Sequence, residues 1–303
     1  MLRSCSKEEF IAHIEFAYAL ATNMKTSGYP TYCDGIKTKA MFVERALKAF
    51  ERETEEMLLF VYEDEVQGLI HYYWLPEDRY LQLIGFHVAR AAEQALSEFL
   101  EYVGERFRGY DAYLGFPSEN RSAVQFLAAQ GFECIENDYN NTAFLDQLDS
   151  GPENRDVIQI RRENYQWFQT LHCQTQGDMY WDSERIYDAL DDWIIFVRET
   201  DGKPQGAVYY RNIEDGWFEI FGIDIDHGKY DPALFMELLN AALSDAKRRN
   251  GRFMTFFCEE AYEAAAKACG FVCVGNYLCY NTHLLYCEKI KTARTGIVRY
   301  VPS

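Results

Sequence analysis

Hydrophobic positions along this chain follow two spacings, which predict helices and strands in a definite order. Ser6 is followed three residues later by Glu9, the spacing of a helix capping box, and apolar residues then recur at helical intervals. Short apolar runs rich in aromatic and β-branched residues predict strands. In the first half these lie near 57–63, 66–74, 80–88 and 112–116, and further helices are expected over about 39–52, 91–107 and 118–130. The predicted order is therefore two helices, a hairpin, a third strand, a helix, a strand and a helix.

The second half of the chain repeats this order. The strand 80–86 recurs as 217–223, and its mid-strand Gly85 recurs as Gly222, 137 residues later. A repeat of this length is too long for a solenoid unit, so each copy is expected to have its own core. We predict an α+β protein of two tandem domains, 1–148 and 156–303, each a mixed, mostly antiparallel sheet flanked by helices. A polar segment, 147–155, joins them.

One strand of the second copy has no evident partner in the first. Residues 157–160 alternate like a strand before the first helix of copy two, and nothing similar is apparent before the first helix of copy one. The C-terminal segment 294–303 also alternates like a strand. We therefore expect it to fold back and fill this edge of the first domain.

Composition limits the partners of the chain. Its 303 residues are 48% hydrophobic and 16% aromatic, which suffices for two packed cores, and its formal net charge is −18. Such a charge repels nucleic acid and anionic membranes, so a small-molecule partner, cationic or neutral, is expected. The nine cysteines show no paired metal-ligand spacing, and we see no export signal or long apolar span. Buried cysteines in a reducing cytoplasm are the expectation.

The segment from Asn120 to Phe132, NRSAVQFLAAQGF, resembles a signature of GNAT acyltransferases, N-x-x-A-x-x-F-Y-x-K-x-G-F. The order of predicted elements is similar to that family as well, and copy two ends its equivalent helix with Gly270-Phe271. The resemblance implies a tandem GNAT-type N-acetyltransferase. It also implies acetyl-CoA or another acyl-CoA as donor, with the Asn120 segment beside the pantetheine arm.

The family's second signature, Q/R-x-x-G-x-G/A, lets a helix N-terminus bind the pyrophosphate of the donor. The equivalent stretches here, 87–93 and 226–232, both lack this glycine pattern, so the cofactor loops are degenerate in both copies. Copy two keeps one glycine before an Asp231-Pro232 helix start, and an aspartate there competes with phosphate for the helix amides. Its donor-binding residues are expected to be Ile223, Ile225, Gly228, Lys229 and Tyr230.

Two residues are candidates for the chemistry of copy two. Glu219 lies among large apolar residues of a strand, at a position similar to that of a base in some GNAT enzymes. Either it lies on the solvated face or it is held for catalysis. Neither copy has the family's usual helix tyrosine, but Tyr262 lies one helical turn earlier and is either the substitute acid or a packed tyrosine. His71 and His87 are expected to be histidines without chemistry.

Two functions follow from these residues. The first is transfer of an acyl group from a coenzyme A thioester to a small amine by copy two, with copy one as a degenerate structural partner. The alternative is a non-catalytic binding or interaction module on the same fold, because both cofactor loops are altered. The sequence does not distinguish among acyl donors, acceptors or oligomeric states.

Overall fold

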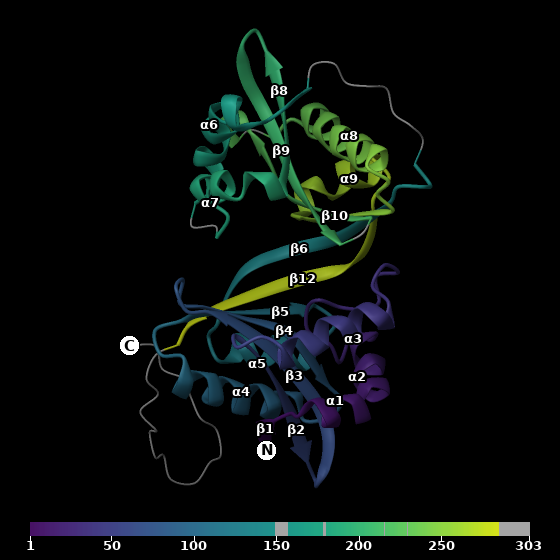
Figure 1. Cartoon of the computed structure of the whole chain (residues 1–303), viewed down its shortest axis with the longest axis vertical. Helices are drawn as coiled ribbons and strands as arrows, with labels where there is room; N and C mark the ends of the chain where they lie inside the picture. The colour runs from purple at the N-terminus through teal and green to yellow at the C-terminus, as the bar shows by residue number, and fades with distance from the viewer. Residues whose placement is uncertain (149–156, 178–179, 215, 229, 285–303) are drawn as a thin grey trace. The chain divides into compact units, whose positions relative to one another are not determined.

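The computed structural model describes residues 1–148, 157–177, 180–214, 216–228 and 230–284. Its internal contacts divide the chain into two compact units. Unit 1 comprises Met1–Asn137 together with residues 275–284, and unit 2 comprises Asp138–Val274. Each unit is a mixed sheet with helices on both faces, which confirms the predicted fold class (Figure 1).

Unit 1 has the strand order β1-β2-β3-β4-β5-β12. Only β4 and β5 run parallel, and the other neighbours are antiparallel. Its strands are β1 (Leu2–Ser4), β2 (Glu55–Tyr62), β3 (Glu65–Leu75), β4 (Tyr80–Val88), β5 (Asp111–Pro117) and the end of β12 (Val272–His283). Its helices are α1 (Lys7–Ala12), α2 (Ile14–Ala21), α3 (Lys39–Leu47), α4 (Ala92–Arg106) and α5 (Arg121–Ala129).

Unit 2 has the strand order β6-β11-β10-β9-β8-β7, and only β10 and β11 run parallel. Its strands are the end of β6 (Glu133–Phe144), β7 (Val157–Gln159), β8 (Trp193–Thr200), β9 (Lys203–Glu214), β10 (Trp217–Ile225) and β11 (Phe253–Cys258). Its helices are α6 (Gln166–Thr175), α7 (Ser183–Asp188), α8 (Pro232–Arg248) and α9 (Glu260–Ala268).

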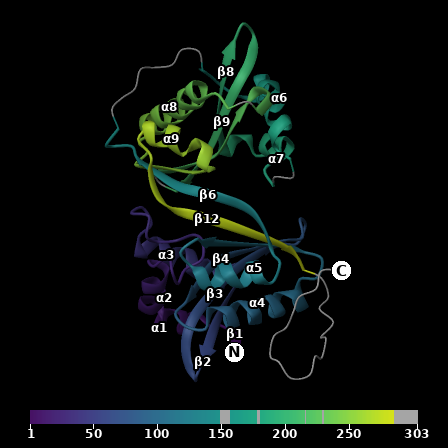
Figure 2. The ribbon, with the colours of Figure 1, turned by 180° about the vertical axis from the view of Figure 1, so that it is seen from behind.

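Successive side chains along each strand point to opposite faces of the sheet, so each unit has two cores. In unit 1, Leu58 and Phe60 pack under α4 and α5, whereas Met57 and Leu59 pack against α1 to α3. In unit 2, α8 and α9 cover one face of the sheet, and α6 and α7 cover the other (Figure 1). The view from behind shows the same two layers of helices in each unit (Figure 2). Among the described helices, none is long and apolar enough to span a membrane.

The last strand of each copy completes the sheet of the other unit. β12 follows α9 of unit 2 but pairs with β5 of unit 1 from Tyr277 to His283 (Figure 1). β6 follows α5 of unit 1 but pairs with β11 of unit 2 from Tyr139 to Phe144. The compact units therefore differ from the predicted boundaries 1–148 and 156–303, because a strand is exchanged at the end of each copy.

The expected empty edge in copy one is also corrected. Residues Leu2–Ser4 form β1, which pairs antiparallel with β2, and they are the counterpart of β7 beside β8. The predicted segment 294–303 lies outside the described residues. The capping box at the start of α1 is confirmed, because Glu9 N–H donates to Ser6 Oγ and Ser6 N–H donates to the Glu9 carboxylate.

Candidate functional site

The two parallel strands of each unit part from each other halfway along their length. In unit 1, β4 and β5 pair from Tyr80 and Asp111 as far as Leu83 and Leu114, although both strands continue. In unit 2, β10 and β11 pair only as far as Ile220 and Phe256. The pairing stops at equivalent positions in both copies.

A β-bulge lies next to each point of parting. The register shifts by one residue between Ile220 and Gly222 of β10, and the equivalent shift in unit 1 skips Ile84 before Gly85. Each bulge therefore lies beside one of the two equivalent mid-strand glycines, Gly85 and Gly222. Gly222 has to be a glycine, because a Cβ placed there would lie 2.2 Å from the Tyr209 hydroxyl.

In unit 1 the parted strands are bridged by a loop of the same unit. Gly28 N–H donates to the carbonyl oxygen of Phe86 at 2.7 Å, and Val88 N–H donates to that of Thr26 at 3.0 Å. On the other side, Tyr29 N–H donates to the Gly115 carbonyl of β5 at 2.9 Å. The segment 26–29, which we call the bridging loop, therefore fills the place of a missing strand between β4 and β5.

Asn120, a predicted donor-side residue, holds the bridging loop. Its side chain is buried and donates to the Ser27 carbonyl at 3.0 Å. Its side-chain oxygen accepts from Ala123 N–H at 3.3 Å, which caps the start of α5. Both polar ends of the side chain are thus used within unit 1.

The equivalent strand edge of unit 2 is formed by Ile223 and Ile225. Their positions match Phe86 and Val88 in the repeat, and their side chains pack against the core under α8. Among the described residues of unit 2, the backbone of Ile223 and Ile225 makes no hydrogen bond to a loop. At the described ends of the loop after α6, the Trp181 carbonyl accepts from His172 Nε2 and the Gln176 side chain accepts from Ser183 N–H.

The N-terminus of α8 is capped from within the chain, as the sequence suggested. The Asp231 carboxylate accepts from Ala233 N–H at 2.9 Å and Leu234 N–H at 3.2 Å. Just before it, Gly228 has a positive φ of 63° and open space at its Cβ position. The predicted Lys229 lies outside the described residues.

The candidate acid Tyr262 packs in an aromatic cluster at this end of unit 2. Its ring stacks on Phe235 at 4.8 Å and meets Tyr230 edge-on at 4.9 Å. Burial and the nearby Glu259 carboxylate raise the pKa of its phenol. The Tyr230 side chain is 40% exposed and packs over Tyr262.

The candidate base Glu219 faces the opposite side of the sheet from Tyr262. Phe218 and Ile220 belong to the core under α8, so Glu219 between them points to the α6 side. Thr255 Oγ1 donates to Glu219 Oε2 at 3.4 Å and accepts from Trp217 Nε1 at 3.0 Å. Glu219 is half-buried in this polar environment, whereas Tyr262 lies among aromatic rings.

Glu219 belongs to a row of facing residues that crosses five strands of unit 2. Each member lies directly opposite the next in the strand register, so all share one face. From β8 to β6 the row is Trp193, Arg211, Glu219, Thr255 and Thr142. We call it the polar row.

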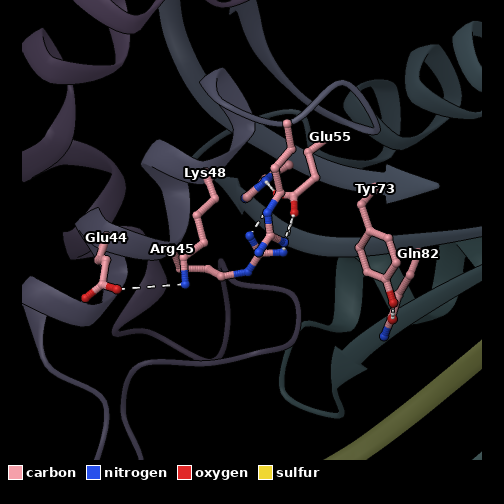
Figure 3. A network of polar contacts seen from close by, with 8 residues as sticks. Glu44, Arg45, Lys48, Glu55, Tyr73 and Gln82 are labelled. Atoms are coloured by element: carbon pink, nitrogen blue, oxygen red, sulfur yellow. Dashed lines mark hydrogen bonds and ion pairs between the residues drawn. The ribbon is translucent and has the colours of Figure 1, made fainter. Parts of the chain in front are cut away.

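Unit 1 has an equivalent row, but its polar groups are paired with one another. Gln82 occupies the position of Glu219 and accepts hydrogen bonds from Tyr73 at 2.6 Å and Tyr80 at 3.0 Å. At the end of this row the buried Glu55 accepts from Arg45, Arg52 and His71 (Figure 3). Burial would raise the pKa of the Glu55 carboxyl, but these hydrogen bonds outweigh it and lower the pKa to about 2.

Sequence reasoning missed a buried ion pair beyond the bulge of β10. Asp224 is 4% exposed and accepts from His172 Nδ1 at 2.9 Å and from Thr175 Oγ1 at 2.6 Å. His172 Nε2 donates to the Trp181 carbonyl at 2.9 Å. Burial would lower the pKa of the His172 imidazole, but Asp224 and the Trp181 carbonyl together raise it, which favours the protonated ring. The sequence signal that could have revealed this pair is a charged residue, Asp224, between the apolar strand residues Ile223 and Ile225.

The two histidines of β3 and β4 are buried and neutral. His71 Nε2 donates to Glu55 at 3.1 Å, and burial lowers its pKa. His87 occupies the position of Asp224, and burial with the adjacent His71 lowers its pKa to about 3. Its Nδ1 has no hydrogen-bond partner in the described structure. Nor do the described residues group three potential metal ligands together.

Solved structures of other proteins have the same fold. A GCN5-related N-acetyltransferase from Sphaerobacter thermophilus superposes with a TM-score of 0.64 at 14% identity, covering 94% of this chain and 96% of that one. A tandem GNAT protein from the clavulanic acid biosynthesis pathway gives 0.55 at 12% identity, covering 95% and 99%. The chain has a tandem GNAT-type fold.

A third similar structure is a GCN5-related glucosamine N-acetyltransferase region in a fungal multi-domain GH3 beta-N-acetylglucosaminidase. It gives a TM-score of 0.60 at 9% identity and covers 93% of this chain and 38% of that one. No protein-family model matches the sequence, and no curated protein matches it. The fold is therefore established by structure at sequence identities that do not carry function with them.

Proposed function

We propose that unit 2 transfers an acyl group from a coenzyme A thioester to an amine. The observation that carries this proposal is the difference between the two pairs of parted strands. In unit 1 the backbone of Phe86 and Val88 is bound by the bridging loop, and in unit 2 the equivalent Ile223 and Ile225 have no such loop among the described residues. Unit 2 is therefore the better place for an extended ligand.

The pantetheine arm of coenzyme A suits this strand edge chemically. It is a linear chain with two amide groups, so it can accept from one backbone N–H and donate to one backbone carbonyl. The bridging loop makes that pair of hydrogen bonds with Val88 and Phe86 in unit 1. We expect the Ile225 N–H and the Ile223 carbonyl to make them with the donor.

The phosphate end of the donor fits less well. Asp231 occupies the N–H groups of Ala233 and Leu234 and places a negative charge where a pyrophosphate would bind. The remaining candidates are the backbone around Gly228 and Tyr230. Asp231→Asn keeps a capping side chain and removes the charge, so it should strengthen binding of coenzyme A.

In the reaction, the amine nitrogen attacks the thioester carbonyl, a C–N bond forms and the C–S bond breaks. Glu219 takes the proton that the ammonium group loses, directly or through a water molecule. The departing thiolate takes a proton from water, because Tyr262, the acid suggested by the sequence, packs on the other face of the sheet from Glu219. Unit 1, whose equivalent position is Gln82, has no carboxylate for this step and is proposed to be a structural partner.

Isothermal titration with acetyl-CoA and with coenzyme A tests donor binding. Ile225→Pro removes the N–H assigned to the donor and should abolish the binding heat, while Ile225→Val keeps that N–H and should preserve it. Absence of heat at concentrations that detect about millimolar affinity would support the binding-module alternative. In turnover assays Glu219→Gln should lose about 10²–10⁴-fold in rate. Gln82→Glu is the matched variant in unit 1 and should keep full activity.

A further inference from the structure

We infer that the acceptor of unit 2 is an amino-acid-like molecule, an amine that also carries a carboxylate, held by the polar row. This inference rests on the proposed acyl transfer and adds the class of acceptor. Glu219 would receive the amine, and Arg211 with Trp193 would bind the carboxylate.

Arg211 is fixed in place, but its hydrogen-bonding capacity is not filled. Its guanidinium group lies over the rings of Trp181 and Trp193, 5.2 and 5.1 Å from their centroids. One terminal nitrogen lies 3.5 Å from the carboxylate of Asp192, a side chain that is 65% exposed, so this ion pair is weak. Arg211 Nε is buried and has no hydrogen-bond partner among the described residues.

Trp193 provides a second donor of the same kind. It is 6% exposed and lies directly opposite Arg211 in the β8–β9 ladder. Its indole N–H likewise meets no acceptor in the parts of the chain that the structure describes. A buried donor without an acceptor is unfavourable, so two adjacent ones favour a ligand that brings acceptor oxygens. A carboxylate has two such oxygens and matches the planar donor face of a guanidinium group.

The position of Glu219 sets the other end of the ligand. Arg211 and Glu219 are directly opposite on adjacent antiparallel strands, which places their Cβ atoms about 4.5–5.5 Å apart. That spacing suits a molecule whose ammonium and carboxylate groups are separated by one or a few carbon atoms. Glu219 repels a carboxylate and attracts an ammonium group, so the charges of the row fix the orientation of the ligand.

Unit 1 shows that the fold alone does not create this arrangement. The positions of Trp193, Arg211 and Glu219 are occupied there by Glu55, Tyr73 and Gln82. Tyr73 donates to Gln82, and Glu55 is saturated by two arginines and a histidine (Figure 3). The unfilled donors beside a carboxylate are therefore a property of unit 2.

Titration of the full-length protein with the twenty standard L-amino acids tests the inference directly. Phenethylamine, tyramine, tryptamine, histamine and cadaverine serve as matched amines that lack the carboxylate. At least one amino acid should bind at least tenfold more tightly than its matched amine or, where it has none, than any amine of the set. Arg211→Gln should weaken that binding tenfold or more, and Arg211→Lys should weaken it less. Trp193→Phe keeps the ring over Arg211, loses the N–H and should weaken binding several-fold.

Tyr73→Phe, which changes the equivalent position of unit 1, is the matched control and should bind like the unaltered protein. The inference is overturned if no amino acid binds, if the amines bind as tightly, or if Arg211→Gln leaves the affinity unchanged. Acyl transfer is measured separately by thiol release from acetyl-CoA. Equal transfer to amines and amino acids would uphold the proposed function and overturn the inference. Selective amino-acid binding without thiol release would uphold the ligand class and overturn the transfer.

Discussion

The backbone N–H of Gly28 donates a hydrogen bond to the carbonyl oxygen of Phe86, 2.7 Å away, in the space where β4 and β5 part. Among the described residues, unit 2 has no equivalent hydrogen bond to Ile223. In unit 1 a strand edge suited to a ligand is bound by the chain itself, and Asn120 secures that loop through Ser27. In unit 2 the equivalent edge is the one proposed to bind a donor.

Gly28→Ala should destabilise the protein by about 1–3 kcal/mol, because the new methyl group has no room. Its Cβ would lie 3.0 Å from the Cβ of Phe86 and 3.2 Å from the Gly115 carbonyl oxygen. Urea unfolding measures the change. Gly104→Ala, in α4 with nothing within 4 Å of the new Cβ, is the matched control and should stabilise by about 0.4–1 kcal/mol. Equal stability of Gly28→Ala and the unaltered protein would mean that the bridging loop is not held as described.

Because of the ion pair between His172 and Asp224, the stability of the protein should fall as the pH rises. Burial is the largest single effect and would lower the pKa of His172, but the hydrogen bond and the charge of Asp224, with the hydrogen bond to the Trp181 carbonyl, together outweigh it and raise the pKa above 6.5. The stabilisation is therefore complete below the unfolded-state pKa and is lost as pH rises through the higher folded-state pKa. Urea unfolding between pH 6 and 9 should show this decline.

Two variants isolate the contribution of this pair. His172→Gln and Asp224→Asn should each flatten the decline between pH 6 and 9, and the double variant should lose less than the sum of the two single losses. Additive losses, or an unchanged slope in both single variants, would show that the two side chains are not coupled.

His87 should make the protein less stable as the pH falls. Its folded-state pKa of about 3 lies below its ordinary value of 6.5, so acid protonates the unfolded chain first. Stability should therefore fall as pH drops below about 6.5, by at most about 1.4 kcal/mol per pH unit for this group. His87→Leu removes the titrating ring and its unpaired Nδ1, and should reduce this slope in unfolding curves between pH 6.5 and 4. A steeper slope in the variant would contradict the assignment.

Strand exchange predicts which pieces of the chain fold alone. A fragment of residues 138–274 contains all strands of unit 2 and should unfold cooperatively as a monomer. A fragment of residues 1–148 lacks β12, so β5 presents an unpaired edge and the fragment should self-associate or aggregate. Analytical ultracentrifugation and circular dichroism compare the two. A monomeric, cooperatively folded 1–148 fragment would show that β12 is dispensable for unit 1.

Most elements of the fold could be predicted because they depend on local patterns. The predicted strand over 80–88 is β4, and the predicted helix over 91–107 is α4. The repeat also identified Gly85 and Gly222 as equivalent positions, and each lies beside a bulge in the structure. The role of Asn120 could not be found in this way, because its partner Ser27 is 93 residues distant in the chain.

Only some residues of the candidate site could be predicted from the sequence. Glu219 and Tyr262 could be selected from strand and helix patterns, but their opposite faces follow from which neighbours entered the core under α8. Arg211 and Trp193 were not selected, since neither belongs to a motif. Their importance depends on strand register, which sets side chains from different strands opposite each other.

The two-copy α+β organisation, the order of helices and strands, the repeated mid-strand glycines and the aspartate cap of α8 could all be found in the amino-acid sequence. They depend on periodicity and on residues a few positions apart. Three other features became visible only in the folded chain: which strand completes each sheet, the bridging loop between β4 and β5, and the unfilled donors in the polar row of unit 2. Those depend on contacts between distant segments, where packing and hydrogen-bond partners are settled only when the chain folds.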